Sequence, residues 1–175
     1  MATTKWTLDP THSELHFKVK HLMITNVTGT VSVISANVEA DDDKFTNAKV
    51  SFAADPKTIS TNNEQRDGHL RTADFFETDK YPEIKFESTD FNASAGKIKG
   101  NLTIRGISKP VTLDVEFHGT TKDPWGNEKA GFSFSGKISR KEWDLNYNAA
   151  LETGGVLLSD EVKVIAEIQL AKQAA

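Results

Sequence analysis

The sequence predicts an all-β, antiparallel fold, and two features of its pattern support that prediction. Apolar and polar residues alternate in eight separate stretches, as expected for strands with one buried face. Short, turn-rich links at residues 93–96, 106–110 and 122–127 join several of these stretches into hairpins. Successive hairpins with one apolar face form a sandwich or a closed barrel, and eight strands suffice for a barrel that holds one small ligand.

The eight expected strands are spread along the whole chain. Their apolar positions are, in order, Leu15, Phe17 and Val19; Val27, Gly29, Val31 and Val33; Ala48, Val50, Phe52 and Ala54; Ile84, Phe86 and Ser88; Ile98, Gly100, Leu102 and Ile104; Val111, Leu113, Val115 and Phe117; Ala130, Phe132, Phe134, Gly136 and Ile138; and Val162, Val164, Ala166, Ile168 and Leu170. After Val33 the apolar positions change parity to Ile34, Ala36 and Val38, which predicts a bulge or a bend in one long strand. Residues 5–9 are a candidate for a short ninth strand.

Two connections are too long to be plain turns. Within residues 55–81, Thr61 and Glu64 have the spacing of a capping box, which predicts a helix of about three turns over residues 62–73, weakened by Gly68. The link at residues 140–159 carries several apolar side chains, and long loops of this kind often cover a site or a barrel end. No internal repeat or linker divides the sequence, so one domain over residues 1–175 is expected.

Composition and charge exclude several classes of protein. The 25 acidic and 21 basic residues give a formal net charge of −4 without any block of like charge, so we expect no nucleic-acid partner. The absence of cysteine excludes disulfides, thiolate metal sites and cysteine nucleophiles. The sequence has neither a transmembrane-length apolar run nor an apolar core near Met1, so we expect a cytoplasmic protein, or a periplasmic one if a leader has been removed.

The densest polar cluster is RDGHLR at residues 66–71. An Asp67–His69 pair could act as a general base, which would make the chain a small barrel hydrolase or isomerase, although it has no Gly-x-Ser-x-Gly nucleophile motif. The same residues could instead hold a helix against the barrel by ion pairs, or contact the polar end of a ligand. Because the histidines lack the alternate spacing of a metal site on a strand, we expect neither a metal nor a cofactor.

The phenylalanines indicate what occupies the interior of the fold. Six of them have the apolar parity of their strands: Phe17, Phe52, Phe86, Phe117, Phe132 and Phe134. Rings of this size could fill the interior completely, as in an interaction module, or they could line a slender apolar channel. The strand pattern by itself leaves both possibilities open.

The sequence resembles the YceI-like family over about residues 4–171. Seven short motifs occur in the family's order, namely WTLDPTHSELHF (residues 6–17), RDGHL (66–70), DFF (74–76), YPEIKF (81–86), LTIRGISKPV (102–111), RKEWDL (140–145) and LSDEV (158–162). Two positions depart from the family's pattern, because Thr30-Val31 replaces the usual aromatic after the glycine of the second strand, and Trp143-Asp144 stands where many members have an aromatic followed by glycine.

The resemblance implies an extended eight-stranded antiparallel lipocalin-like β-barrel with a short helix between strands three and four. It also implies a non-catalytic protein that binds a long amphiphile in an apolar pore, for storage, transport or metabolism. The ligand would be a polyisoprenoid, such as a polyprenyl pyrophosphate or an isoprenoid quinone, or else a fatty acid or amide. A homodimer is expected by the same analogy.

Parity and motif positions together select the candidate ligand-binding residues. Arg66 and His69 match the family motif and are expected to meet the polar head where the helix borders the pore mouth. The tail is expected to lie against Phe17, Val19, Val31, Phe52, Phe76, Phe86, Leu102, Ile104, Leu113, Phe132, Phe134 and Trp143. An apolar wall binds by burial, at about 25 cal/mol per Å², and therefore selects for the length and shape of a tail.

Overall fold

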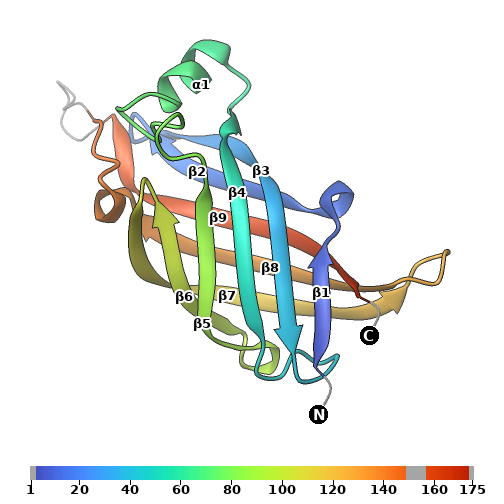
Figure 1. The fold of residues 1–175 in the computed structure, drawn as a ribbon. Helices are drawn as coiled ribbons and strands as arrows, with labels where there is room; N and C mark the ends of the chain where they lie inside the picture. Colours follow the sequence, from blue (N-terminus) through green and yellow to red (C-terminus); the bar gives the residue numbers. More distant parts are fainter. Residues whose placement is uncertain (1–2, 149–156, 174–175) are drawn as a thin grey trace.

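A single antiparallel sheet of nine strands closes on itself in the computed structural model, which describes residues 3–148 and 157–173 (Figure 1). The strands are β1 (Thr4–Leu8), β2 (Glu14–His21), β3 (Thr25–Ala40), β4 (Lys49–Ser60), β5 (Ile84–Asn92), β6 (Lys97–Ile104), β7 (Ile107–Lys122), β8 (Glu128–Ser139) and β9 (Leu158–Lys172). One α-helix, α1 (Glu64–Leu70), and three 3-10 turns, η1 (Pro10–His12), η2 (Ala93–Ala95) and η3 (Arg140–Trp143), complete the described chain. The helix lies at one end of the barrel, and the chain termini lie toward the other (Figure 1).

The barrel has eight positions because β1 and β2 share one of them. Both strands lie between β3 and β9, with β2 paired to the early part of β3 and β1 paired to its late part. They are the two halves of one strand that η1 interrupts. The predicted eight-stranded lipocalin-like barrel is therefore confirmed, and the short stretch at residues 5–9 is part of that broken strand.

The break between β1 and β2 is held by the side chain of Asp9. Its carboxylate accepts hydrogen bonds from the Thr11 amide at 3.2 Å, from Lys129 Nζ at 3.0 Å and from Gln169 Nε2 at 3.1 Å, so it ties η1 to β8 and β9. Burial raises the pKa of Asp9, but the hydrogen bonds from Lys129, His12 and Thr11 outweigh it and hold that pKa well below its ordinary value. Asp9 is thus an ionised anchor for the barrel's only interrupted position among the described residues.

The predicted change of parity in the long strand is confirmed. The pairing of β3 with β4 shifts register between Val33 and Ser35. Val31 is buried before the shift and Ala36 after it, while Ile34 at the irregularity is 49% exposed. The irregularity keeps an apolar side chain facing inward on both halves of a strand that bends around the barrel.

The helix is shorter than predicted, and its cap is different. It has seven residues, and its N-cap is Asn63, whose side chain accepts the Arg66 amide at 2.9 Å. Thr61, the predicted capping residue, is buried and donates its hydroxyl to Asp67 Oδ1 at 2.6 Å. The helix ends at Leu70, after which the chain turns, with the Phe76 amide donating to the Leu70 carbonyl.

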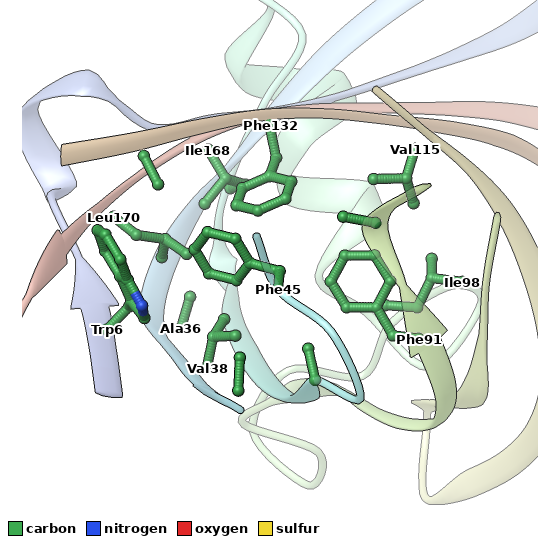
Figure 2. Packing of buried hydrophobic residues seen from close by; sticks show 14 of the residues in the cluster. Trp6, Ala36, Val38, Phe45, Phe91, Ile98, Val115, Phe132, Ile168 and Leu170 are labelled. Atoms are coloured by element: carbon green, nitrogen blue, oxygen red, sulfur yellow. The ribbon is translucent and has the colours of Figure 1, made fainter. Parts of the chain in front are cut away.

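One end of the barrel is filled by aromatic side chains (Figure 2). Phe45, in the loop between β3 and β4, is fully buried and lies 4.8 Å from the Phe132 ring, 5.1 Å from Trp6 and 5.2 Å from Phe117, between ring centroids. Phe91 extends the cluster along β5 and lies 6.1 Å from Phe132. These rings form a solid floor, so the remaining interior space lies toward α1.

Candidate functional site

The barrel encloses a cavity of about 370 Å³, within the range of small-molecule sites. Every strand from β2 to β9 contributes to its wall, and Phe91 and Phe132 form its floor. Along β9 the wall extends from Leu158 to Leu170, about 40 Å of extended strand. A space of this volume along that much strand is long and narrow.

Inward-facing glycines allow large side chains to fit inside the barrel. Phe17 lies directly opposite Gly29, and a Cβ at residue 29 would be 2.2 Å from the Phe17 ring. Gly100 makes the same kind of room for Phe86. Each ring occupies the space beside a glycine, where any larger residue would clash with it.

Most of the residues predicted to contact the tail line this cavity. Eleven of the twelve are in its wall, namely Phe17, Val19, Val31, Phe52, Phe76, Phe86, Leu102, Ile104, Leu113, Phe132 and Phe134. The structure brings them together around one space, while their contact with a ligand stays a prediction. The interior is neither wholly filled nor wholly hollow, because aromatic rings fill one end and line the rest.

Trp143 is the exception, and the structure corrects its assignment to the cavity wall. Its side chain is fully buried in a separate cluster with Phe75, Ile104 and Leu145. The indole Nε1 donates to the Leu102 carbonyl at 2.9 Å. This interaction fastens η3 to β6, behind the cavity wall, so Trp143 supports the barrel rather than facing its interior.

Arg66 and His69 lie at the α1 end of the cavity, as the sequence predicted, but both have protein partners. Arg66 is exposed, and its Nε and Nη2 donate to the hydroxyl and the carbonyl of Thr61 at 2.7 and 2.8 Å. His69 Nε2 lies 2.8 Å from Asp74 Oδ2, and its ring meets the edges of Phe75 and Tyr147. Two of the five N–H groups of Arg66 and one ring nitrogen of His69 are therefore used within the protein.

The Asp67–His69 pair considered for general-base catalysis does not form. Asp67 is buried and accepts the amide of Thr61 at 2.8 Å and its hydroxyl at 2.6 Å. These bonds attach the first turn of α1 to the end of β4, since Thr61 directly follows that strand. The carboxylate beside His69 belongs to Asp74 instead.

Arg140 is a polar residue of the cavity wall that the sequence reasoning missed. It directly follows β8, as the first residue of η3, and is only 6% exposed. Burial lowers the pKa of its guanidinium, and the charge of Asp160 partly offsets that effect. The inward parity of β8 continues through Ile138 to Arg140, and that continuation is the signal that could have identified it.

Phe45 is a second residue that the sequence reasoning missed. Its φ of 60° places it in the left-handed region, within a loop whose neighbours are mostly polar or charged. The Asp42 carboxylate accepts the amides of Lys44 and Thr46 at 3.0 and 3.2 Å and so shapes the loop around it. No periodic pattern indicates that this isolated ring turns back into the barrel.

Residues 3–148 and 157–173 contain neither a metal-binding cluster nor a membrane-spanning helix. No three of the histidine, aspartate and glutamate side chains described there gather into a group that could hold a metal ion. No helix in the same residues has the length and apolarity needed to cross a membrane.

A closed antiparallel barrel with an apolar internal cavity at the helix end defines a lipocalin-like β-barrel protein. The model of the YceI-like domain matches residues 6–170, nearly the whole chain. The chain belongs to the YceI-like family, and the resemblance noted in its motifs is confirmed.

Relatives with known sequences or structures agree with this assignment. The UPF0312 protein SA2479 of Staphylococcus aureus strain N315 is 40% identical over 169 residues, which cover 96% of this chain and 98% of that protein. The solved structure of a Campylobacter jejuni YCEI protein is 32% identical, with a TM-score of 0.68 over 89% of this chain and 90% of that one.

Two more distant structures share the fold. BcnA of Burkholderia cenocepacia is 19% identical and has a TM-score of 0.74 over 93% of this chain and 98% of its own. A polyisoprenoid binding domain from Saccharophagus degradans is 16% identical and has a TM-score of 0.68 over 96% of this chain and 98% of its own. At these identities the likeness concerns the fold alone.

Proposed function

We propose that this protein binds a long-chain amphiphile, with a polyisoprenoid as the favoured class, and holds the tail inside the barrel. The observation that supports the proposal is the long, narrow cavity with an almost entirely apolar wall. The relative from Saccharophagus degradans is described as a polyisoprenoid binding domain, and its barrel superposes over nearly the whole of this chain. The choice of a polyisoprenoid among long tails follows the description of that protein and is part of the proposal.

The energetics of such a site are adequate for useful affinity. Burying about 400 Å² of apolar tail contributes about 10 kcal/mol before the entropic costs of binding are subtracted. A dissociation constant near 1 μM needs about 8 kcal/mol. The tail makes no hydrogen bonds, so affinity is expected to depend on how far it extends toward the floor at Phe132.

A binding role fits the site better than an enzymatic one. The wall is almost entirely apolar, and His21, His69 and Tyr147 are the described lining residues that could transfer a proton. His69 and Asp74 form their pair at the α1 end, where both side chains are partly exposed to water. Stabilisation of a developing charge is weakest in such a solvated position.

The proposal is tested by native mass spectrometry of the purified full chain, with and without added geranylgeraniol, followed by solvent extraction and identification of any bound lipid. We expect a one-to-one complex with a long-chain lipid. Absence of any bound lipid, together with failure to take up geranylgeraniol, would rule the proposal out.

Filling the cavity provides the matched mutational test. Leu102→Trp places an indole in the channel and is expected to abolish uptake of geranylgeraniol, while the far-UV spectrum stays that of a β-barrel. Asn101→Trp adds the same group to the outer face of β6 and is expected to leave uptake unchanged. Equal uptake by a folded Leu102→Trp protein would contradict a binding site at this position.

A further inference from the structure

The guanidinium of Arg140 has unused donors on the wall of the cavity. Its Nε donates to the Ser159 carbonyl at 2.9 Å, and its Nη1 donates to the carbonyls of Leu145 and Tyr147 at 2.8 and 3.2 Å. Nη2 has no hydrogen-bond acceptor among the described residues. It is also not fully enclosed by protein atoms, so a ligand can reach it. Two N–H groups of a buried cation are therefore left for a ligand.

The charge of Arg140 also lacks a direct counter-ion among the described residues. Asp160 is the acidic residue whose charge acts on it, but no ion pair within 4 Å joins the two among the described side chains. The Asp160 carboxylate accepts hydrogen bonds from the Ser139 hydroxyl and from the Lys141 amide instead. Arg140 therefore presents an unmatched positive charge beside an apolar channel. A buried charge without a partner is costly, so an anion bound next to Arg140 would be stabilised.

The surroundings of Arg140 hold its guanidinium in place. The three carbonyls that it contacts come from the start of β9 and from the segment after η3, so the fork is fixed from two sides. Arg66, the cation first expected to meet a head group, differs from it, since Arg66 is exposed and donates two of its nitrogens to Thr61. A buried guanidinium that is held from two sides binds an oxyanion more strongly than an exposed one.

We propose that Arg140 binds the anionic head of the amphiphile, a carboxylate or a phosphate, through Nη2 while the tail occupies the channel. The inference rests on the proposed lipid-binding function and adds a selectivity to it. Anionic amphiphiles are preferred over neutral ones with the same tail. Tyr147 and His69, whose rings lie 4.8 Å apart, border the same end of the cavity as Arg140.

The test compares three ligands that share one tail: geranylgeranyl phosphate, geranylgeranoic acid and geranylgeraniol. Equilibrium dialysis of the full chain is expected to show both anions bound at least about ten-fold more tightly than the alcohol, the effect of one charge-assisted hydrogen bond. Preference for only one of the two anions identifies which oxyanion the site takes, and supports the proposal.

Variants then assign that preference to one residue. Arg140→Gln is expected to weaken both anions by about ten- to a hundred-fold and to leave the alcohol nearly unchanged. Arg66→Gln is the matched control and is expected to keep the preference for anions. Loss of the preference in Arg66→Gln but not in Arg140→Gln would overturn the assignment.

A measurement on the unmutated protein keeps the test decisive if Arg140→Gln does not fold. The ionisation of geranylgeranoic acid with a ¹³C-labelled carboxyl group is followed by NMR while it is bound. Beside a guanidinium the carboxyl pKa stays at or below its ordinary value, whereas in an apolar wall without a cation that pKa rises. A raised pKa of the ligand carboxyl group contradicts the role of Arg140, and so does equal binding of the anions and the alcohol. Binding of the alcohol alone still supports the lipid-binding function.

Discussion

Replacing Phe45 with alanine is expected to destabilise the barrel by about 4 kcal/mol, in the range for removing a buried phenylalanine ring. The ring is fully buried and makes close contacts with three aromatic neighbours, Trp6, Phe117 and Phe132. Aromatic pairs of this kind each contribute about 0.5–1.5 kcal/mol beyond burial, so the loss is not expected at the low end of the range for buried phenylalanine rings. The φ of 60° does not confound the comparison, because alanine also has a Cβ and bears a similar strain there.

Urea unfolding measures this change directly. With a slope of about 2 kcal/mol per M, a loss of about 4 kcal/mol lowers the unfolding midpoint by about 2 M. Trp125→Ala removes a larger aromatic side chain that is 82% exposed, and its free energy of unfolding is expected to change by less than about 0.5 kcal/mol. A loss below about 1 kcal/mol in Phe45→Ala would refute the view that this ring holds the closed end together.

The same substitution has an expected effect on ligand choice. Phe132 forms the cavity floor, and Phe45 packs against it from the other side with the ring centroids 4.8 Å apart. Without Phe45 the floor loses its support and the channel deepens. In native mass spectrometry, Phe45→Ala is expected to bind prenols longer than geranylgeraniol relatively better than the unmutated chain does, and an unchanged preference would show that the floor does not limit tail length.

Two further predictions concern the barrel wall. Asp9→Asn removes a charge from the break between β1 and β2 and is expected to cost about 1.5–3 kcal/mol near pH 6, measured by urea unfolding. Because the folded-state pKa of Asp9 is depressed, its stabilisation is complete above the ordinary carboxyl pKa of about 3.9 and is lost as the pH falls toward the folded value, so the difference between the two proteins is expected to shrink below about pH 4. A difference independent of pH would contradict the ionic role of Asp9. Gly100→Ala is expected to lower the free energy of unfolding by about 1–3 kcal/mol, because its Cβ would lie 2.4 Å from the Glu87 carbonyl oxygen and 2.5 Å from the Phe86 ring. Gly68→Ala in α1, where a Cβ meets nothing within 4 Å, is the control and is expected to be neutral or to stabilise the protein by up to about 1 kcal/mol. Equal effects at the two glycines would show that crowding in the wall is not the cause.

The strands of this barrel could be predicted from sequence because their burial alternates residue by residue. Alternation identifies Phe17, Phe86 and Phe132 as inward-facing without any knowledge of which strands are neighbours, and all three line the cavity. The bulge after Val33 could be predicted for the same reason, since a change of parity is visible locally.

Features that depend on long-range contacts could not be predicted in this way. Trp143 would be in an apolar environment both in the cavity wall and behind it. The hydrogen bond from its indole Nε1 to the Leu102 carbonyl places it behind the wall. Phe45 is an isolated apolar residue in a polar loop and so belongs to no periodic pattern. The helix boundary depends on Asn63 rather than Thr61, because Thr61 is recruited by the buried carboxylate of Asp67.

The position shared by β1 and β2 has a consequence for how the chain reaches this structure during synthesis. The barrel closes only when β9, the last strand of the described residues, pairs with β8 on one side and with β1 and β2 on the other. Until residues near Lys172 leave the ribosome, the earlier strands can form only an open sheet with an exposed apolar face and unpaired edges. Contacts between the two ends of the sequence also slow folding. A tail can therefore be enclosed only after β9 has been synthesised and has paired with both of its neighbours.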